Sequence, residues 1–164
     1  MYKEVQRTLP WWIYLVVALL GVLTLVSSYF LFRESSTIDE LQLSVLGSVV
    51  IVFLPIAAIL LILSIRLETI IYSDGVQYRF FPFQFRSRFI PWTEITRAEV
   101  RKYRPFAEFG GWGIRFNLKY KTTAYNISGK MGLELELKNG RKILIGTQRP
   151  DEVKTAVGTF YRNP

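Results

Sequence analysis

Two long uncharged runs open the chain: TLPWWIYLVVALLGVLTLVSSYFLF (residues 8–32) and LQLSVLGSVVIVFLPIAAILLILSI (residues 41–65). An α-helix needs about 20 apolar residues to cross the hydrocarbon core of a bilayer, and both runs exceed that length. A helix also satisfies its own backbone hydrogen bonds in lipid. The pattern therefore predicts a two-helix transmembrane hairpin in residues 1–65, with helices over about 11–32 and 41–65.

Basic residues flank these runs unevenly. Lys3 and Arg7 precede the first run and Arg66 follows the second, whereas the short connector carries one basic residue, Arg33. The positive-inside rule then places both termini in the cytoplasm and predicts a multi-pass protein of the inner (cytoplasmic) membrane. Neither run contains an ionisable side chain, which argues against an ion or proton pathway through this chain.

Small residues recur inside both runs, and in lipid such residues let helix backbones approach closely. They are candidate helix-packing positions, either within the hairpin or against a second subunit. These positions are Ala18, Gly21, Ser44, Gly47 and Ser48.

The composition of the chain excludes most catalytic chemistry. The sequence contains neither Cys nor His, so disulfides, thiolate nucleophiles and the commonest metal ligand and general base are missing. No carboxylate pair accompanies a nucleophile or a metal-ligand pattern. We therefore expect no enzyme, no cofactor and no metal site. From residue 66 onward the chain carries 18 Lys/Arg against 9 Asp/Glu, which favours an anionic partner such as lipid headgroups.

Residues 66–164 form a second predicted domain, in which the apolar period changes from helical to two. Asp74-Gly75 and Asn139-Gly140 are typical hairpin turns, whose residues tolerate positive φ. Pro150 suits a first helical turn, and apolar residues then recur at helical spacing up to Phe160. The pattern predicts about seven antiparallel strands followed by one amphipathic helix, an α+β membrane protein as a whole.

Three segments carry a resemblance to a known family: IPWTEI (residues 90–95), GGWGIR (110–115) and GRKILIGTQRP (140–150). With the strand order and the terminal helix, they resemble bacterial membrane-anchored pleckstrin-homology-like (PH-like) domains. The resemblance implies an antiparallel β-barrel capped by a C-terminal α-helix, and it brings no catalytic residue. The phosphoinositide site of that family is not carried over, because the first turn, residues 73–75, is short and acidic.

Two basic clusters are candidate sites for anionic lipid or a protein partner. Arg86 and Arg88 are spaced to share one strand face, and Arg101, Lys102 and Arg104 follow a later strand. The alternative interpretation is a solvated sheet face or charges that protect an edge strand.

Nearby aromatic residues pose a related choice. Phe81, Phe83 and Phe85 are opposite in parity to Tyr78 and Phe80. Either a register change lets both sets fill the core, or one set lies outside as an interfacial wedge or partner surface.

The sequence thus predicts a non-enzymatic, membrane-anchored PH-like binding or scaffold module. It would dock a protein partner or anionic lipid at the cytoplasmic membrane face. An alternative is an accessory subunit of a larger membrane complex, or a homo-oligomer, assembled through the hairpin. An enzyme or a nucleic-acid binder is a remote alternative, since the chain carries no recognised motif for either, and we expect no nucleic-acid partner.

Overall fold

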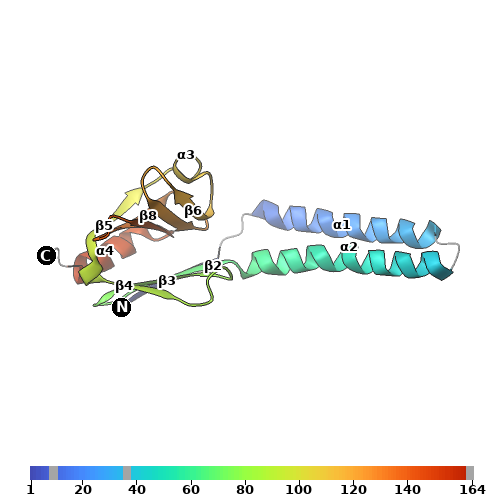
Figure 1. Cartoon of the computed structure of the whole chain (residues 1–164), viewed down its shortest axis with the longest axis horizontal. Helices are drawn as coiled ribbons and strands as arrows, with labels where there is room; N and C mark the ends of the chain where they lie inside the picture. Colours follow the sequence, from blue (N-terminus) through green and yellow to red (C-terminus); the bar gives the residue numbers. More distant parts are fainter. Residues whose placement is uncertain (8–10, 35–37, 162–164) are drawn as a thin grey trace. The chain divides into compact units, whose positions relative to one another are not determined.

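The computed structural model describes residues 1–7, 11–34 and 38–161 (Figure 1). The chain divides into two compact units. The helical unit comprises Leu9–Ser64, and the β-unit comprises Met1–Thr8 together with Ile65–Pro164. The β-unit therefore also takes in the N-terminal residues, which the predicted boundary at residue 65 places with the helices.

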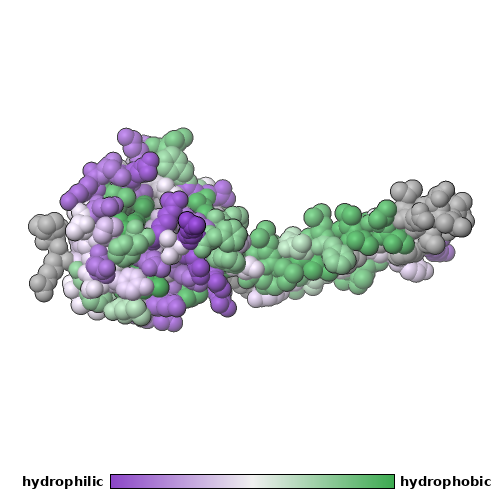
Figure 2. All heavy atoms as spheres, turned by 60° about the horizontal axis from the view of Figure 1, so that its bottom comes forward, coloured by the Kyte–Doolittle hydropathy of each residue, from purple (hydrophilic) through white to green (hydrophobic). Residues whose placement is uncertain are grey.

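The helical unit consists of two helices that lie side by side, α1 (Trp11–Glu34) and α2 (Ile38–Ser64). Half-buried residues recur along α1 at Val17, Gly21 and Thr24, the spacing of one helix face. Among the candidate packing positions, Gly21 and Gly47 are half-buried and Ala18 is exposed, while the side chains of Ser44 and Ser48 lie outside the described residues. The face of this unit that Figure 2 shows is mostly apolar where its residues are described.

The prediction of a two-helix transmembrane hairpin is wrong. Within the described residues a single helical segment, Val45–Ser64, has the length and hydropathy to cross a membrane. Among the residues of α1 whose side chains the structure describes, the apolar stretch is Tyr14–Phe30, which falls short of the roughly 20 residues that a span requires.

The first sheet of the β-unit is antiparallel, with strand order β1-β2-β3-β4. Its strands are β1 (Tyr2–Gln6), β2 (Arg66–Ile71), β3 (Gly75–Phe81) and β4 (Arg88–Pro91). Gln6 pairs with Leu67, so the chain leaves this sheet after β1 and returns to the neighbouring strand once the helical unit is complete. The whole helical unit is therefore an insertion between two adjacent strands.

The second sheet has the order β5-β8-β9-β7-β6 and contains a parallel pair, β7 with β9. Its strands are β5 (Ile95–Lys102), β6 (Gly113–Asn117), β7 (Thr122–Asn126), β8 (Met131–Leu137) and β9 (Lys142–Thr147). The connecting helices are η1 (Trp92–Glu94), α3 (Pro105–Phe109) and the terminal α4 (Pro150–Phe160). The amphipathic helix after Pro150 is thus confirmed.

The prediction of a closed antiparallel barrel of about seven strands is also wrong. The described residues form two separate sheets with nine strands, and no ladder joins one sheet to the other. The additional β1 extends the first sheet, and the parallel pairing of β7 with β9 reorganises the second. Both features depend on partners that are distant in the sequence.

The main hydrophobic core lies between the two sheets and α4. It includes Leu67 and Phe80 from the first sheet, Leu135 and Ile145 from the second, and Val153 from α4. Neighbouring residues of β7 and β9 point to the opposite face, where Ala124 and Leu144 join Tyr103 and Phe109 in a smaller cluster beside α3. The second sheet is therefore covered by side chains on both faces.

Candidate functional site

The β3–β4 loop (Pro82–Ser87) presents aromatic rings to solvent. The side chains of Phe83 and Phe85 are 61% and 78% exposed, whereas Tyr78 and Phe80 on the preceding strand are buried. Of the two alternatives from parity, the structure places Phe83 and Phe85 outside the core. Contacts with β3 hold the loop in place. The Phe80 and Phe83 ring centroids lie 6.0 Å apart, and the Gln84 backbone amide donates to the Phe80 carbonyl at 2.7 Å.

This loop starts at a defined end of the first sheet. Phe81, the last residue of β3, pairs with Arg66, the first residue of β2. Arg66 follows Ser64, the last residue of α2, by two positions. The Arg66 guanidinium also lies over the Phe81 ring, 4.8 Å from its centroid. The aromatic loop thus begins at the strand end where the chain connects to the helical unit.

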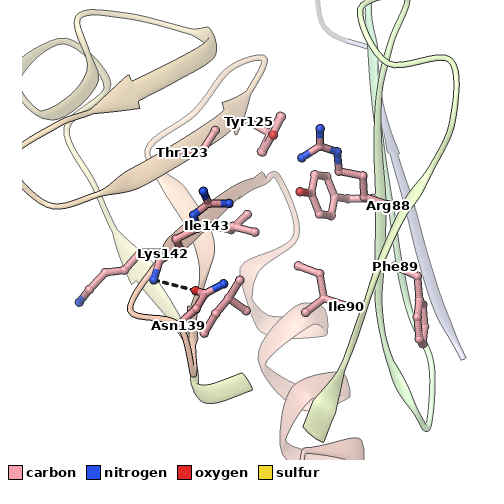
Figure 3. A pocket seen from close by; sticks show the side chains of 11 residues that line it. Arg88, Phe89, Ile90, Thr123, Tyr125, Asn139, Lys142 and Ile143 are labelled. Atoms are coloured by element: carbon pink, nitrogen blue, oxygen red, sulfur yellow. Dashed lines mark hydrogen bonds between the residues drawn. The ribbon is translucent and has the colours of Figure 1, made fainter. Parts of the chain in front are cut away.

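The structure separates the two arginines of the first basic cluster. Arg86 is exposed within the loop, and Arg88 is the exposed first residue of β4. In Figure 3 the Arg88 side chain extends toward Tyr125 of β7, across the space between the sheets. The two residues therefore lie on different surfaces. Arg86 belongs to the exposed loop, and Arg88 lines a cleft between the two sheets.

The second basic cluster is largely neutralised. Arg101 forms ion pairs with Glu134 at 2.7 Å and with Glu108 at 3.0 Å, which tie α3 to the second sheet. Burial lowers the pKa of the Arg101 guanidinium, but these two carboxylates raise it by more, so that the pKa lies above its usual value. Lys102 and Arg104 are exposed, and the Arg104 amide donates to the Glu108 carboxylate at 2.7 Å. Arg101 therefore has a structural role.

A cavity of about 210 Å³ lies beside this cluster. Arg101 and Lys142 line it together with Glu108 and Glu134, so its charges are balanced. This balance makes it a poor site for an anion.

A larger cleft of about 330 Å³ opens between the two sheets (Figure 3). Tyr78, Arg88 and Ile90 line it from the first sheet. The second sheet and its β8–β9 turn supply Thr123, Tyr125, Ile143, Asn139 and Arg141. No carboxylate is among the lining residues. Sequence reasoning identified only Arg88 here; the available signal was the basic pair that follows the Asn139-Gly140 turn.

The two tyrosines of the cleft pack together, with ring centroids 4.9 Å apart. Burial raises the pKa of the Tyr78 hydroxyl well above its ordinary value, and the neighbouring Tyr125 adds to this effect. Tyr78 is therefore a neutral hydroxyl throughout the physiological pH range. By contrast, the Lys142 ammonium forms an ion pair with Glu136, and in Figure 3 its side chain points away from the cleft.

The edge of the second sheet carries an apolar surface of its own, which we call the β6 edge. Within the described residues, strand β6 pairs only with β7, and side chains on and around it are both apolar and exposed. They are Phe106, Trp112, Ile114, Phe116, Leu118 and Tyr120.

The described residues contain no group of three or more His, Cys, Asp or Glu side chains that could hold a metal ion. Comparison of the chain with protein-family models, with curated proteins and with solved structures finds no match. The function must therefore be argued from the surfaces described above.

Proposed function

We propose that this chain is a non-enzymatic, membrane-anchored binding module whose β-unit docks on anionic lipid at the surface of that membrane. The helical unit supplies the anchor. Its described surface exposes large apolar side chains such as Leu25, Phe53 and Leu54, each about two-thirds exposed. Contiguous exposed apolar surface of this kind marks contact with lipid or protein.

The observation that carries the proposal is the exposed aromatic and basic β3–β4 loop. Inserting a Phe side chain into an apolar phase contributes roughly 1.5–3 kcal/mol. An Arg near an anionic surface adds roughly 1 kcal/mol. Phe83, Phe85 and Arg86 combine both contributions within four consecutive residues.

The location of the loop supports the same proposal. The β1–β2 pairing brings both chain connections of the helical unit to one end of the first sheet, because Gln6 lies opposite Leu67. The β3–β4 loop starts at that end, opposite Arg66. The start of the β3–β4 loop and the chain connections to the helical unit thus lie at the same end of the first sheet.

The absence of cysteine in the chain permits a direct test. A Ser87→Cys variant, labelled with an environment-sensitive fluorophore, places one probe in the loop. Ser73→Cys is the matched control, since Ser73 lies in the β2–β3 turn at the opposite end of the same strands. Both full-length variants are placed in nanodiscs of neutral lipid and of lipid containing about 30% phosphatidylglycerol.

The expected result is a blue shift at position 87 in anionic nanodiscs and none at position 73. Phe83→Ser with Phe85→Ser should abolish the shift, and Arg86→Gln should reduce it. Equal emission at position 87 in neutral and anionic nanodiscs would overturn lipid docking. Full solubility of the chain without detergent or lipid would overturn the anchor.

The β6 edge favours a second candidate, a protein partner that adds a strand to the second sheet. Strand addition uses the unpaired backbone of an edge strand, and the exposed Ile114 and Phe116 would contact alternate side chains of the partner. Arg115, Lys119 and Lys121 lie beside them, and no acidic residue occurs between Glu108 and Glu134. This charge pattern fits an acidic partner strand and disfavours a second copy of the same edge.

An alternating Glu/Val peptide is the probe for this candidate. It should shift the amide NMR signals of β6, whereas a Lys/Val peptide should not. Phe116→Lys should weaken the interaction. If neither peptide shifts the amide signals of β6, strand addition at the β6 edge is contradicted.

A further inference from the structure

We propose that the cleft between the two sheets binds a compact phosphate-bearing group. This site is separate from the lipid-docking loop, and it would exist even if that loop never touched a membrane. The site would occupy the open space between β4 and the strands β7 and β9, which a closed barrel would lack.

The cleft owes its existence to the pairing of β4. Among the strands that the structure describes, β4 is an edge of the first sheet and pairs only with β3. Its Arg88 and Ile90 therefore face Tyr125 and Ile143 of the other sheet across open space (Figure 3). The volume of about 330 Å³ is at the lower end of the range for small-molecule sites, which suits a headgroup or a sugar phosphate.

The charges of the cleft are unbalanced. Within the described part of the chain, neither the Arg88 nor the Arg141 guanidinium forms an ion pair. Five of the other described arginines of the β-unit form ion pairs with carboxylates, whereas Arg86, Arg104 and Arg115 do not. The five that do are Arg66, Arg79, Arg97, Arg101 and Arg149. Two guanidinium groups without an ion pair, beside a cleft without a carboxylate, attract an anion.

The donors in the cleft suit phosphate in particular. A guanidinium presents a planar fork of N–H groups that matches two phosphate oxygens. Thr123, Asn139 and the tyrosine hydroxyls supply neutral donors around it. Ile90 and Ile143 form apolar walls, which strengthen these polar contacts by excluding water. A phosphate monoester offers enough acceptor oxygens to use several donors at once.

Calorimetric titration of the full chain in a neutral detergent tests the site. Inorganic phosphate and glycerol 3-phosphate are the soluble probes, and nanodiscs containing phosphatidic acid present the same group on a lipid. Binding of the soluble probes identifies a soluble phosphate ester as sufficient. Binding only to phosphatidic acid identifies the lipid headgroup as the source. Either result supports a phosphate site if the variants below behave as expected.

Arg88→Gln and Arg141→Gln should each weaken binding by about tenfold or more, the loss typical of a charge-assisted hydrogen bond. Lys154→Gln is the control, because it removes the same charge from the exposed face of α4 and should leave the affinity unchanged. The Arg side chains are exposed, so the unfolding temperature without ligand should not change.

Amide NMR of the unmodified chain gives an independent measurement. Phosphate should shift the signals of Thr123, Asn139 and Ile143. The proposal would be overturned if the NMR shifts were confined to other surfaces or if no probe bound. It would also be overturned if Lys154→Gln lost as much affinity as the two Arg variants.

Discussion

Glu4 is a buried carboxylate that joins the first strand to the end of the second sheet. It is 4% exposed and accepts hydrogen bonds from the Thr147 hydroxyl at 2.7 Å and the Gln148 amide at 2.8 Å. Gln6, two residues later, donates to the Gly146 carbonyl at 2.6 Å. One short strand therefore holds both sheets through side-chain contacts.

We expect Glu4→Ala to lower the free energy of unfolding by about 2 kcal/mol, because it leaves buried donors without an acceptor. Chemical denaturation of the full chain in detergent measures this loss. Lys3→Ala is the control, since Lys3 is exposed and should change stability by less than about 0.5 kcal/mol. Equal effects of the two substitutions would contradict the structural role of Glu4.

The buried tyrosines make stability depend on alkaline pH. Burial raises the pKa of both Tyr78 and Tyr103 in the folded chain, whereas a tyrosine in the unfolded chain titrates near pH 10. Above about pH 10 the unfolded state loses protons that the folded state retains. The contribution of these tyrosines to the free energy of unfolding is therefore complete below that pH, and it is lost as the pH rises toward their pKa values in the folded chain.

Each such tyrosine should make the free energy of unfolding fall by about 1.4 kcal/mol per pH unit above pH 10. Tyr78→Phe should make this fall in the free energy of unfolding less steep, by the amount that one tyrosine contributes. Urea unfolding between pH 8 and 11 measures the change. An unchanged slope in Tyr78→Phe would show that the Tyr78 hydroxyl is not protected by folding.

The candidate residues show what sequence can and cannot predict at this scale. The sequence reveals that Phe83 and Phe85 differ in parity from Tyr78 and Phe80, but it leaves open whether either set lies outside the core; the structure places Phe83 and Phe85 there. The neutralisation of Arg101 cannot be predicted from the sequence, because Glu108 and Glu134 reach it from a loop helix and another strand. That Arg141 forms no ion pair with any described residue likewise depends on the three-dimensional arrangement of the chain.

At the scale of elements, Gly75 is required for a reason that differs from its predicted one. The Asp74-Gly75 turn is present, but Gly75 is absent from the positive-φ glycines of the described chain, among which Gly140 has φ 75°. Instead, a Cβ at Gly75 would lie 2.3 Å from the Ile90 carbonyl oxygen and 2.9 Å from the Pro91 Cα. Glycine is needed here because β4 approaches closely.

We expect Gly75→Ala to cost about 2 kcal/mol or more, because the clash is with backbone atoms of the paired strand. Gly158→Ala is the matched control. It lies within α4 with open space around it, so the same substitution should stabilise the chain by roughly 0.5–1 kcal/mol. Thermal unfolding of the two variants should therefore shift in opposite directions, and a shared direction would contradict the close approach.

Local signals predicted most single elements and failed on their pairing. Asn139-Gly140 correctly marked the hairpin of β8 and β9, and Pro150 marked the start of α4. The strand β1 was missed, since its partner begins only at Arg66 and its short polar sequence has no strong signal of its own. The parallel pairing of β7 with β9 also escapes local rules, because it joins segments separated by an entire hairpin strand.

At the scale of the whole molecule, the helical unit is an insertion between β1 and β2. We therefore predict that the β-unit folds when a short linker replaces the helical unit. Replacing residues 8–64 by a linker of about four Gly and Ser residues should join Arg7 to Ile65 as a simple hairpin, since Gln6 and Leu67 are already paired. We expect this variant to be soluble without detergent and to unfold cooperatively.

Deletion of residues 1–64 is the informative comparison. It removes the helical unit together with β1, and so exposes the edge of β2 and the donors that Glu4 satisfies. This variant should be markedly less stable than the linked one by circular dichroism melting. Equal stability of the two would mean that β1 contributes little to the β-unit.

The same insertion has a consequence for biosynthesis. Arg66 follows Gln6 by 60 positions, so a ribosome that adds about 5–20 residues per second completes β1 roughly 3–12 seconds before the first residue of its partner strand exists. During that interval β1 is an unpaired edge emerging ahead of two very apolar helices. The β-unit can fold fully only in molecules whose helical unit has already been made, which couples the maturation of one unit to the synthesis of the other.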